Sequence, residues 1–99
     1  MQIIISAKDF KLTPSLKAYV ERHTETLIRH APTVTDVKVE LDVDHNQHRG
    51  MIYRVEVSAR MGRTYLKAGE KAEHMQEAIN LCIPKLIRQI EKHKTRIVL

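Results

Sequence analysis

The chain has 99 residues, of which 17 are Lys or Arg and 12 are Asp or Glu, so its formal charge at pH 7 is +5. This length is typical of a single domain, expected to span residues 1–99, and a hydrophobic fraction of 42% argues against a disordered chain. One cysteine excludes a disulfide framework, and no run approaches the roughly 18 apolar residues of a membrane helix.

The first residues predict a strand. Residues 2–6 are mostly β-branched and apolar, which indicates a strand at least partly buried on both faces. No basic region precedes this run, so it lacks the form of a secretory signal, and we expect a cytoplasmic protein. The sequence pI of about 9.6 favours an anionic partner.

A helix is expected over residues 14–30. Thr13 followed by Pro14 is a typical start, with a hydroxyl N-cap and proline at the first helical position. One face then recurs at spacings of three and four, formed by Leu16, Tyr19, Val20, His23 and Leu27. The pattern ends at residues 31–32, and His23 should be a packed histidine with one satisfied nitrogen rather than a ligand.

Three strands are expected next. Apolar and polar residues alternate over residues 37–44 and again over 51–60, with a polar loop at 45–50 between them. The first hairpin should adopt the register that sets Glu40 opposite Arg54, because a slide of two residues would oppose Glu40 to Glu56. A two-residue turn at residues 61–62 would pair Val57 with Leu66 and begin a fourth strand over residues 63–69.

The last helix is expected over residues 74–96. Its apolar stripe is formed by Met75, Ile79, Cys82, Leu86 and Ile90. Pro84 lies inside this segment, and proline removes an amide donor and clashes with the preceding turn. We therefore expect either a kink near residues 81–84 or two shorter helices end to end.

The order β-α-β-β-β-α predicts an α+β fold. It is a two-layer sandwich in which a four-stranded sheet is covered on one face by two helices. The first two strands flank a helical crossover and should therefore be parallel.

The strongest functional pattern is a stripe of cations on the last helix. At about 100° per residue, Lys85, Arg88, Lys92 and Arg96 fall within an arc of about 80°, beside the apolar stripe. Such a stripe is suited to contact phosphates. Further candidate RNA-binding residues are Lys17, Arg22 and Arg29 on the first helix and Lys67 and Lys71 near the end of the fourth strand. The alternative is an ordinary solvated helix face.

No pattern indicates catalysis or a metal site. His45 and His48 share one loop, but two ligands are too few and no nearby residue completes a zinc spacing. Cys82 lies on the apolar stripe and is expected to be a small buried hydrophobe. We therefore expect no enzyme, cofactor, metal or small-molecule substrate, although a small α+β enzyme remains the hypothesis from another class.

Four blocks of the sequence carry a resemblance to a known family. They are the opening strand over residues 1–5, the helix start Leu12–Val20, the block Met75–Asn80 and, most specifically, the run Lys-Leu-Ile-Arg-Gln-Ile-Glu-Lys-His-Lys at residues 85–94. Together they resemble the ribosome hibernation promoting factors, also called ribosome-associated inhibitors or ribosomal subunit interface proteins. The resemblance extends from residue 1 to about residue 94.

The resemblance implies a fold similar to double-stranded-RNA-binding domains and a role as a translation silencer. Such a protein would bind the 70S ribosome in the small-subunit cleft, on 16S ribosomal RNA where mRNA and tRNA would sit. By position, the family's RNA-facing cations correspond to Lys17, Arg29, Lys85, Arg88 and Lys92. The chain is most similar to the short branch, which lacks a C-terminal dimerisation domain and is associated with paired 70S ribosomes formed together with a separate ribosome modulation factor. The alternative is a general double-stranded-RNA-binding module.

The chain departs from the family pattern at three places. His74-Met75-Gln76 replaces the usual Asp-Met-Tyr, which removes a helix cap and a tyrosine that could contact RNA. Thr26 replaces a cation of the first helix, and Pro84 replaces a helix-compatible polar residue.

Overall fold

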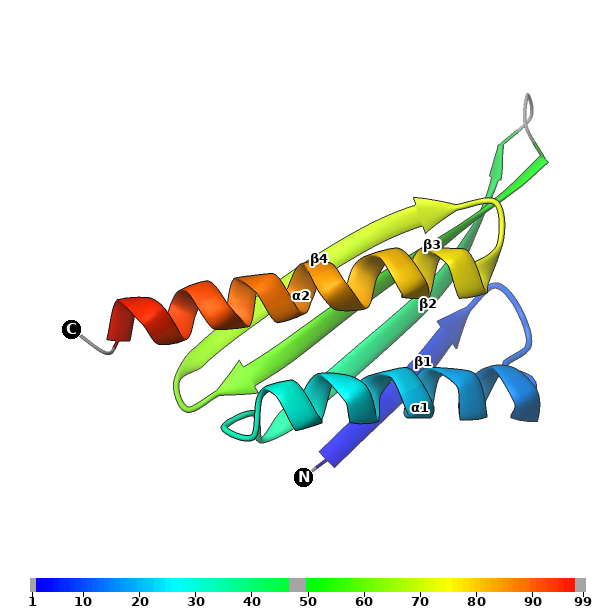
Figure 1. Cartoon of the computed structure of the whole chain (residues 1–99). Helices are drawn as coiled ribbons and strands as arrows, with labels where there is room; N and C mark the ends of the chain where they lie inside the picture. The colour runs from blue at the N-terminus through cyan, green and yellow to red at the C-terminus, as the bar shows by residue number, and fades with distance from the viewer. Residues whose placement is uncertain (1, 47–49, 98–99) are drawn as a thin grey trace.

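The computed structural model describes residues 2–46 and 50–97, with side chains for all of these except 45, 46, 51 and 94–97. Its elements in chain order are β1 (Gln2–Lys8), α1 (Pro14–His30), β2 (Asp36–Asn46), β3 (Gly50–Met61), β4 (Thr64–Ala72) and α2 (Met75–Ile97). The strands form one sheet in the order β1-β2-β3-β4, with β1 parallel to β2 and the other pairs antiparallel. Both helices lie across the same face of the sheet (Figure 1), which confirms the predicted two-layer α+β fold.

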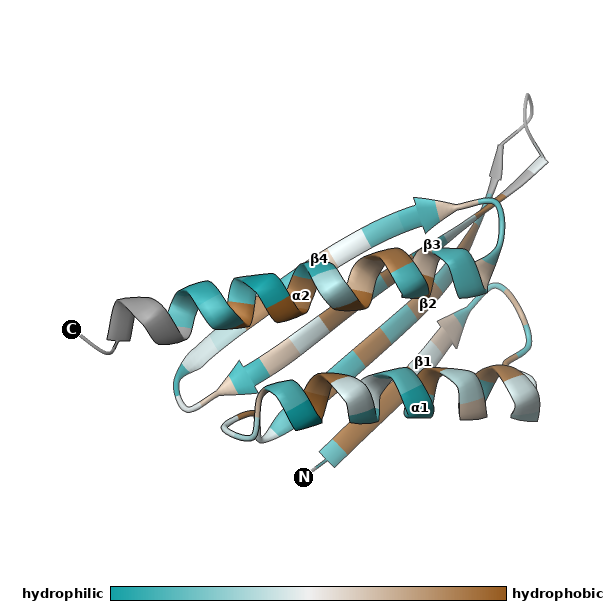
Figure 2. Cartoon of the chain, viewed as in Figure 1, coloured by the Kyte–Doolittle hydropathy of each residue, from teal (hydrophilic) through white to brown (hydrophobic). Residues whose placement is uncertain are grey.

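The core lies between the helices and the inner face of the sheet. Apolar and polar residues alternate along the strands, while each helix carries one hydrophobic side (Figure 2). The largest fully buried apolar side chains are Val20 and Leu27 of α1, Val37, Val39, Leu41 and Val57 of the strands, and Ile79, Leu86 and Ile90 of α2. Cys82 is also fully buried among them, as predicted. This burial holds both helices in one orientation, so their polar faces point to solvent.

The bounds predicted for α1 are confirmed. The Oγ1 atom of Thr13 accepts a hydrogen bond from the backbone N–H of Leu16 at 3.2 Å, and Pro14 is the first helical residue. His23 is half-buried, and its Nδ1 lies 3.0 Å from the backbone oxygen of Tyr19, as expected for a packed histidine.

The prediction that β1 is at least partly buried on both faces is wrong for one of them. Its residues alternate between exposed and half-buried, and Ile4 is 47% exposed. The helices cover only one face of the sheet, so the outer row of β1, which consists of Gln2, Ile4, Ser6 and Lys8, remains in solvent, and Ile4 is its only apolar member.

Both predicted hairpin registers are wrong by two residues. Glu40 lies opposite Glu56, and Val57 pairs with Ala68 rather than Leu66. A shift of two residues keeps every side chain on the same face, so the apolar pattern could not distinguish the alternatives. In the second hairpin the turn is formed by residues 62–63, with Gly62 first at φ 62°, as glycine-first hairpin turns favour.

The like-charge pair in the first hairpin is offset by neighbouring lysines. Lys38 Nζ lies 3.4 Å from Glu40 Oε1, and Lys67 Nζ lies 3.0 Å from Glu56 Oε1. Cross-strand charge pairs contribute only a few tenths of a kcal/mol up to about 1 kcal/mol, so they do not by themselves select a register.

The strands are also longer than predicted. β2 continues to Asn46 and β3 begins at Gly50, so half of the expected loop at 45–50 is strand, and the other half, residues 47–49, lies outside the described residues. β4 spans residues 64–72 rather than 63–69.

The expected interruption at Pro84 does not occur. α2 is one helix from Met75 to Ile97 with Pro84 inside it, and Figure 1 shows α2 as a single unbroken helix. Pro84 is exposed, while Ile83 and Leu86 beside it are buried. Burial on either side of the proline therefore holds the two halves of α2 in line.

Candidate nucleic-acid interface

The cations of α2 lie on the flank that faces β4. Lys85 is the inner member, since its Nζ lies 3.4 Å from the backbone oxygen of Gly69 and 3.5 Å from Glu70 Oε2. Arg88 and Lys92 follow at spacings of three and four residues and are exposed. Arg96 belongs to the same helix, but its side chain lies outside the described ones. The buried stripe of α2 holds this cationic flank in a fixed orientation.

The cations of α1 divide between two sides of the helix. Arg22 and Arg29 are seven residues apart and therefore lie close to one line along the helix. Lys17 precedes Arg22 by five residues, about 140° around the helix, so it lies on another side. All three side chains are exposed.

A polar contact joins the two helices between these cations. The Tyr19 hydroxyl of α1 donates a hydrogen bond of 2.6 Å to Asn80 Oδ1 of α2. The His23 ring stacks on Tyr19 with 4.2 Å between ring centroids. Sequence reasoning missed this contact because it joins residues 61 positions apart and because Tyr19 was interpreted as core.

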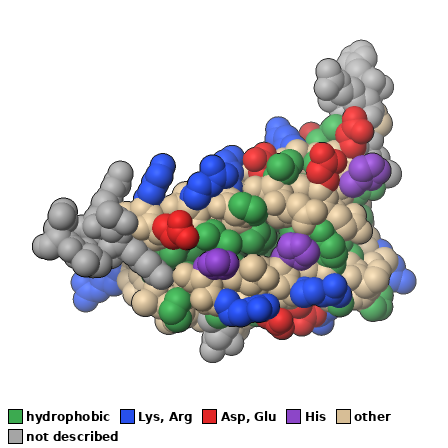
Figure 3. All heavy atoms as spheres, in the orientation of Figure 1, with side chains coloured by type: hydrophobic (Ala, Val, Ile, Leu, Met, Phe, Trp, Pro, Cys, Tyr) green, Lys and Arg blue, Asp and Glu red, His purple; other side chains and the backbone are tan. Residues whose placement is uncertain are grey.

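Basic side chains follow both helices on this face of the molecule. Figure 3 shows Lys and Arg along α1 and along the outer edge of α2, with histidine and hydrophobic side chains between them. Five cations of the helices form no ion pair with any described side chain: Lys17, Arg22, Arg29, Arg88 and Lys92. These charges are therefore available to an external anion.

The two candidate cations of β4 lie on the face of the sheet that the helices do not cover. Lys67 and Lys71 alternate with the buried Ala68 and point away from the helices, so they do not share a surface with the helix cations. Lys67 is also paired with Glu56. The structure thus divides the predicted set of cations between two faces.

The outer sheet face carries charges that neutralise one another. Arg54 Nη2 donates to Asp42 Oδ2 at 2.6 Å, and this hydrogen bond lowers the pKa of Asp42 and raises that of Arg54. Arg60 lies 3.9 Å from Asp36 and covers the ring of Tyr65, which is 66% exposed. With internally paired charges, this face is less suited to phosphate than the helix face.

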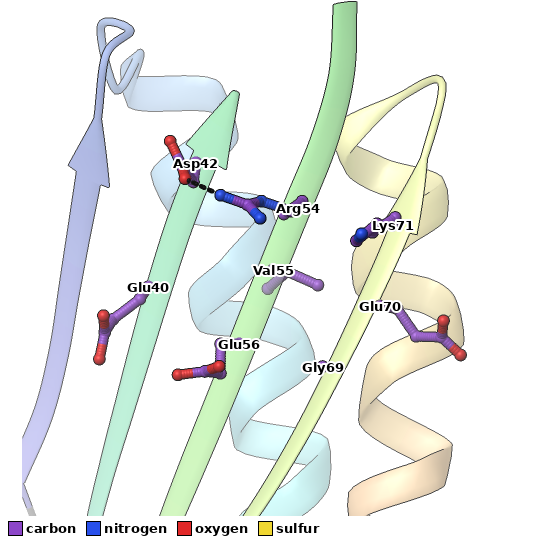
Figure 4. A pocket seen from close by; sticks show the side chains of 8 residues that line it. All are labelled: Glu40, Asp42, Arg54, Val55, Glu56, Gly69, Glu70 and Lys71. Carbon is purple, nitrogen blue, oxygen red and sulfur yellow. Dashed lines mark hydrogen bonds and ion pairs between the residues drawn. The ribbon is translucent and has the colours of Figure 1, made fainter. Parts of the chain in front are cut away.

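A shallow depression of about 320 Å³ opens on the same sheet face (Figure 4). Its lining residues are Glu40, Asp42, Arg54, Val55, Glu56, Gly69, Glu70 and Lys71. Figure 4 shows the Glu40 and Glu56 carboxylates side by side and Arg54 directed to Asp42. Across the described residues, no group of three or more His, Cys, Asp or Glu side chains is arranged to hold a metal ion.

Cys82 is unsuited to nucleophilic chemistry. Its thiol donates to the backbone oxygen of Ala68 at 3.3 Å, and burial raises its pKa to about 11. The thiolate, which is the reactive form, is therefore scarce at neutral pH. Within the described part of the chain, neither helix combines the length and the apolar character that crossing a bilayer requires.

Comparisons with known proteins agree on one family. A family model described as "Sigma 54 modulation protein / S30EA ribosomal protein" matches residues 3–98. A ribosome hibernation promoting factor of Azotobacter vinelandii is 31% identical over 96 residues, covering 97% of this chain and 85% of the relative. A ribosome hibernation promotion factor of Bacillus subtilis is 33% identical, but this chain spans only 50% of its length.

Solved structures share the fold. A ribosomal subunit interface protein from Coxiella burnetii superposes with a TM-score of 0.84 at 15% identity, covering 96% of this chain and 99% of that one. The N-terminal domain of Protein Y from Thermus thermophilus gives a TM-score of 0.73 at 18% identity, with 93% and 94% covered.

Proposed function

The chain belongs to the Sigma 54 modulation protein / S30EA ribosomal protein family, and from this membership we propose that it is a ribosome-binding hibernation factor. Relatives named as ribosome hibernation promoting factors support this role, as does the resemblance noted in the sequence. A factor of this kind acts in the cytoplasm, where ribosomes are, and works by occupying a site rather than by chemistry.

The helix face is the proposed ribosome contact. The observation that carries this assignment is the contrast between the two faces: the cations Arg22, Arg29, Arg88 and Lys92 are unpaired among described residues, whereas those of the sheet face are largely paired. Phosphates of 16S ribosomal RNA would bind these side chains and release their counterions. Lys17, Lys85 and Arg96 would extend the same contact.

Silencing would follow from steric exclusion. A domain held by phosphates in the small-subunit cleft fills the space that mRNA and tRNA require, so translation stops without a covalent step. Pairing of 70S particles would involve a separate ribosome modulation factor as a second partner.

The test is co-sedimentation of the purified protein with 70S ribosomes and separated subunits over a salt series. We expect co-migration with 70S particles and the small subunit, and resistance to excess plain duplex RNA. Each phosphate contact should add about 0.7–0.9 to the slope of log affinity against log salt. Displacement by duplex RNA would instead indicate a general double-stranded-RNA-binding module.

Two matched variants identify the contact face. The triple variant Lys85→Glu, Arg88→Glu and Lys92→Glu should lose ribosome binding but remain folded, with a cost in stability of up to about 1 kcal/mol because Lys85 loses its pair with Glu70. The sheet-face variant Lys67→Glu with Lys71→Glu also reverses cationic charges but should retain most binding. Normal binding by the folded triple variant would refute the assignment of the helix face.

A further inference from the structure

Leu81 is an exposed leucine of α2. Large hydrophobic side chains are exposed at three of the positions that the structure describes, and Leu81, at 48%, is the one that belongs to a helix. The other two, Ile4 and Tyr65, lie on the face of the sheet that the helices leave uncovered. Leu81 therefore adds an apolar contact to the helix face, where the unpaired cations of the described side chains lie.

The position of Leu81 around α2 places it inside the cationic stripe. At about 100° per residue, Arg88 and Lys92 each lie within about 20° of Leu81 around the helix axis. They follow it by two and three turns, which is about 10 Å and about 16 Å along the helix. The buried Leu86 and Ile90 hold the opposite side of α2 against the core. Leu81, Arg88 and Lys92 thus form one exposed row that points away from the sheet.

The side chain of Lys85 leaves Leu81 accessible. A helical side chain leans back over the turn before it, and the stem of a lysine there can shield an apolar neighbour. In this chain the Nζ of Lys85 is directed toward β4, where it lies 3.4 Å from the backbone oxygen of Gly69 and 3.5 Å from Glu70 Oε2. Leu81 accordingly keeps about half of its surface open to a ligand.

An RNA strand offers surfaces that match this row. The cations Arg88 and Lys92 have no carboxylate partner among the described side chains, so they favour an anionic backbone. Next to its phosphates an RNA strand carries bases, and every base has an apolar π-face. A strand whose phosphates bind along α2 at these two cations would therefore present a neighbouring base to Leu81.

We propose that Leu81 packs on the face of an unstacked base of ribosomal RNA, beside the phosphates bound by Arg88 and Lys92. Burial of the exposed part of the leucine adds affinity through the hydrophobic effect, which does not depend on counterion release. Bases stacked within a plain duplex present no free face, so the contact favours structured RNA with splayed-out bases. This inference rests on the proposed ribosome-binding function and adds to it a specificity residue that carries no charge.

The test measures co-sedimentation of the full chain and its variants with 70S ribosomes over a salt series. Leu81→Ala should weaken binding about five- to tenfold, the expected effect of leaving the exposed half of a leucine unburied. Its slope of log affinity against log salt should stay unchanged, whereas Lys92→Ala should lower that slope by about 0.7–0.9. Ile4→Ala is the matched control, because it removes an apolar side chain of similar exposure, 47%, from the sheet face and should bind normally.

A photo-reactive side chain identifies what Leu81 contacts. In the ribosome complex, the variant Leu81→benzoylphenylalanine should crosslink to 16S ribosomal RNA on irradiation. A crosslink to a ribosomal protein instead, or no crosslink in the bound complex, would overturn the base contact.

The outcomes separate this inference from the ribosome-binding function. Normal ribosome binding by Leu81→Ala, an equal loss in Ile4→Ala, or a lower salt slope in Leu81→Ala would overturn the base contact while the proposed function stands. Failure of the unaltered protein to co-sediment with ribosomes would refute the proposed function, and the base contact with it.

Discussion

Replacing Pro84 with alanine should stabilise the protein. Proline in a helix interior costs about 3 kcal/mol relative to alanine, through the lost hydrogen bond and the clash of its ring with the carbonyl four residues earlier. Here α2 remains continuous and Pro84 is exposed, so its ring contributes little packing, and part of that cost is offset because proline also restricts the unfolded chain. We therefore expect Pro84→Ala to raise the free energy of unfolding by about 2 kcal/mol.

The assay is reversible thermal and urea unfolding of the two proteins under identical conditions. For a domain of this size about 1 kcal/mol corresponds to a shift in Tm of about 4–8 °C, so the expected rise is about 8–16 °C. The urea midpoint should rise while the slope m stays constant. A Tm that is unchanged or lower would refute the reasoning, because it would mean that α2 does not depend on the missing backbone bond.

Three further predictions concern the core, a turn and the buried thiol. Leu86→Ala should cost about 2–5 kcal/mol in urea unfolding because Leu86 is 0% exposed, whereas Leu81→Ala, at 48% exposure, should stay within about 0.5 kcal/mol; equal losses would contradict the packing. Gly62→Ala should lower stability by about 1–2 kcal/mol, since φ is 62°, and Gly62→Asn should recover much of it if backbone strain is the cause. The pKa of Cys82 is raised from 9.0 to about 11, so the unfolded thiol ionises first and stability should fall between about pH 9 and pH 11. The Tm of Cys82→Ala should therefore fall less over this pH range than that of the unaltered protein. Identical profiles of Tm against pH for the two proteins would refute the contribution of the thiol.

Local sequence patterns were sufficient to predict those features that depend on residues close together in the chain. Thr13 and Pro14 determine where α1 begins, because capping and a preset φ depend only on neighbouring positions. The spacing of Ile79, Cys82, Leu86 and Ile90 identifies the buried stripe, and with it the flank that carries Lys85, Arg88 and Lys92. The resemblance to the family rests on the same region, and the family assignment was confirmed.

The registers could not be obtained from charge pairing. A two-residue slide preserves the inner and outer faces, so the choice depends on the whole sheet rather than on one pair. The opposed Glu40 and Glu56 show this, because lysines from β2 and β4 compensate for their repulsion. The exposure of Ile4 in β1 has a similar origin, because only the packing shows that no helix covers its face of the sheet.

Composition, periodicity and capping by themselves determined the order of elements, the bounds of α1, the core stripe of α2 and the presence of a cationic helix face, because each depends on residues within a few turns. Only the tertiary structure decided which cations share a surface, since Lys67 and Lys71 lie on the sheet face opposite Arg22 and Arg88. It alone brought Tyr19 to Asn80, a contact between positions 61 residues apart. Such contacts are set when the helices pack on one sheet face, a step that no local pattern encodes.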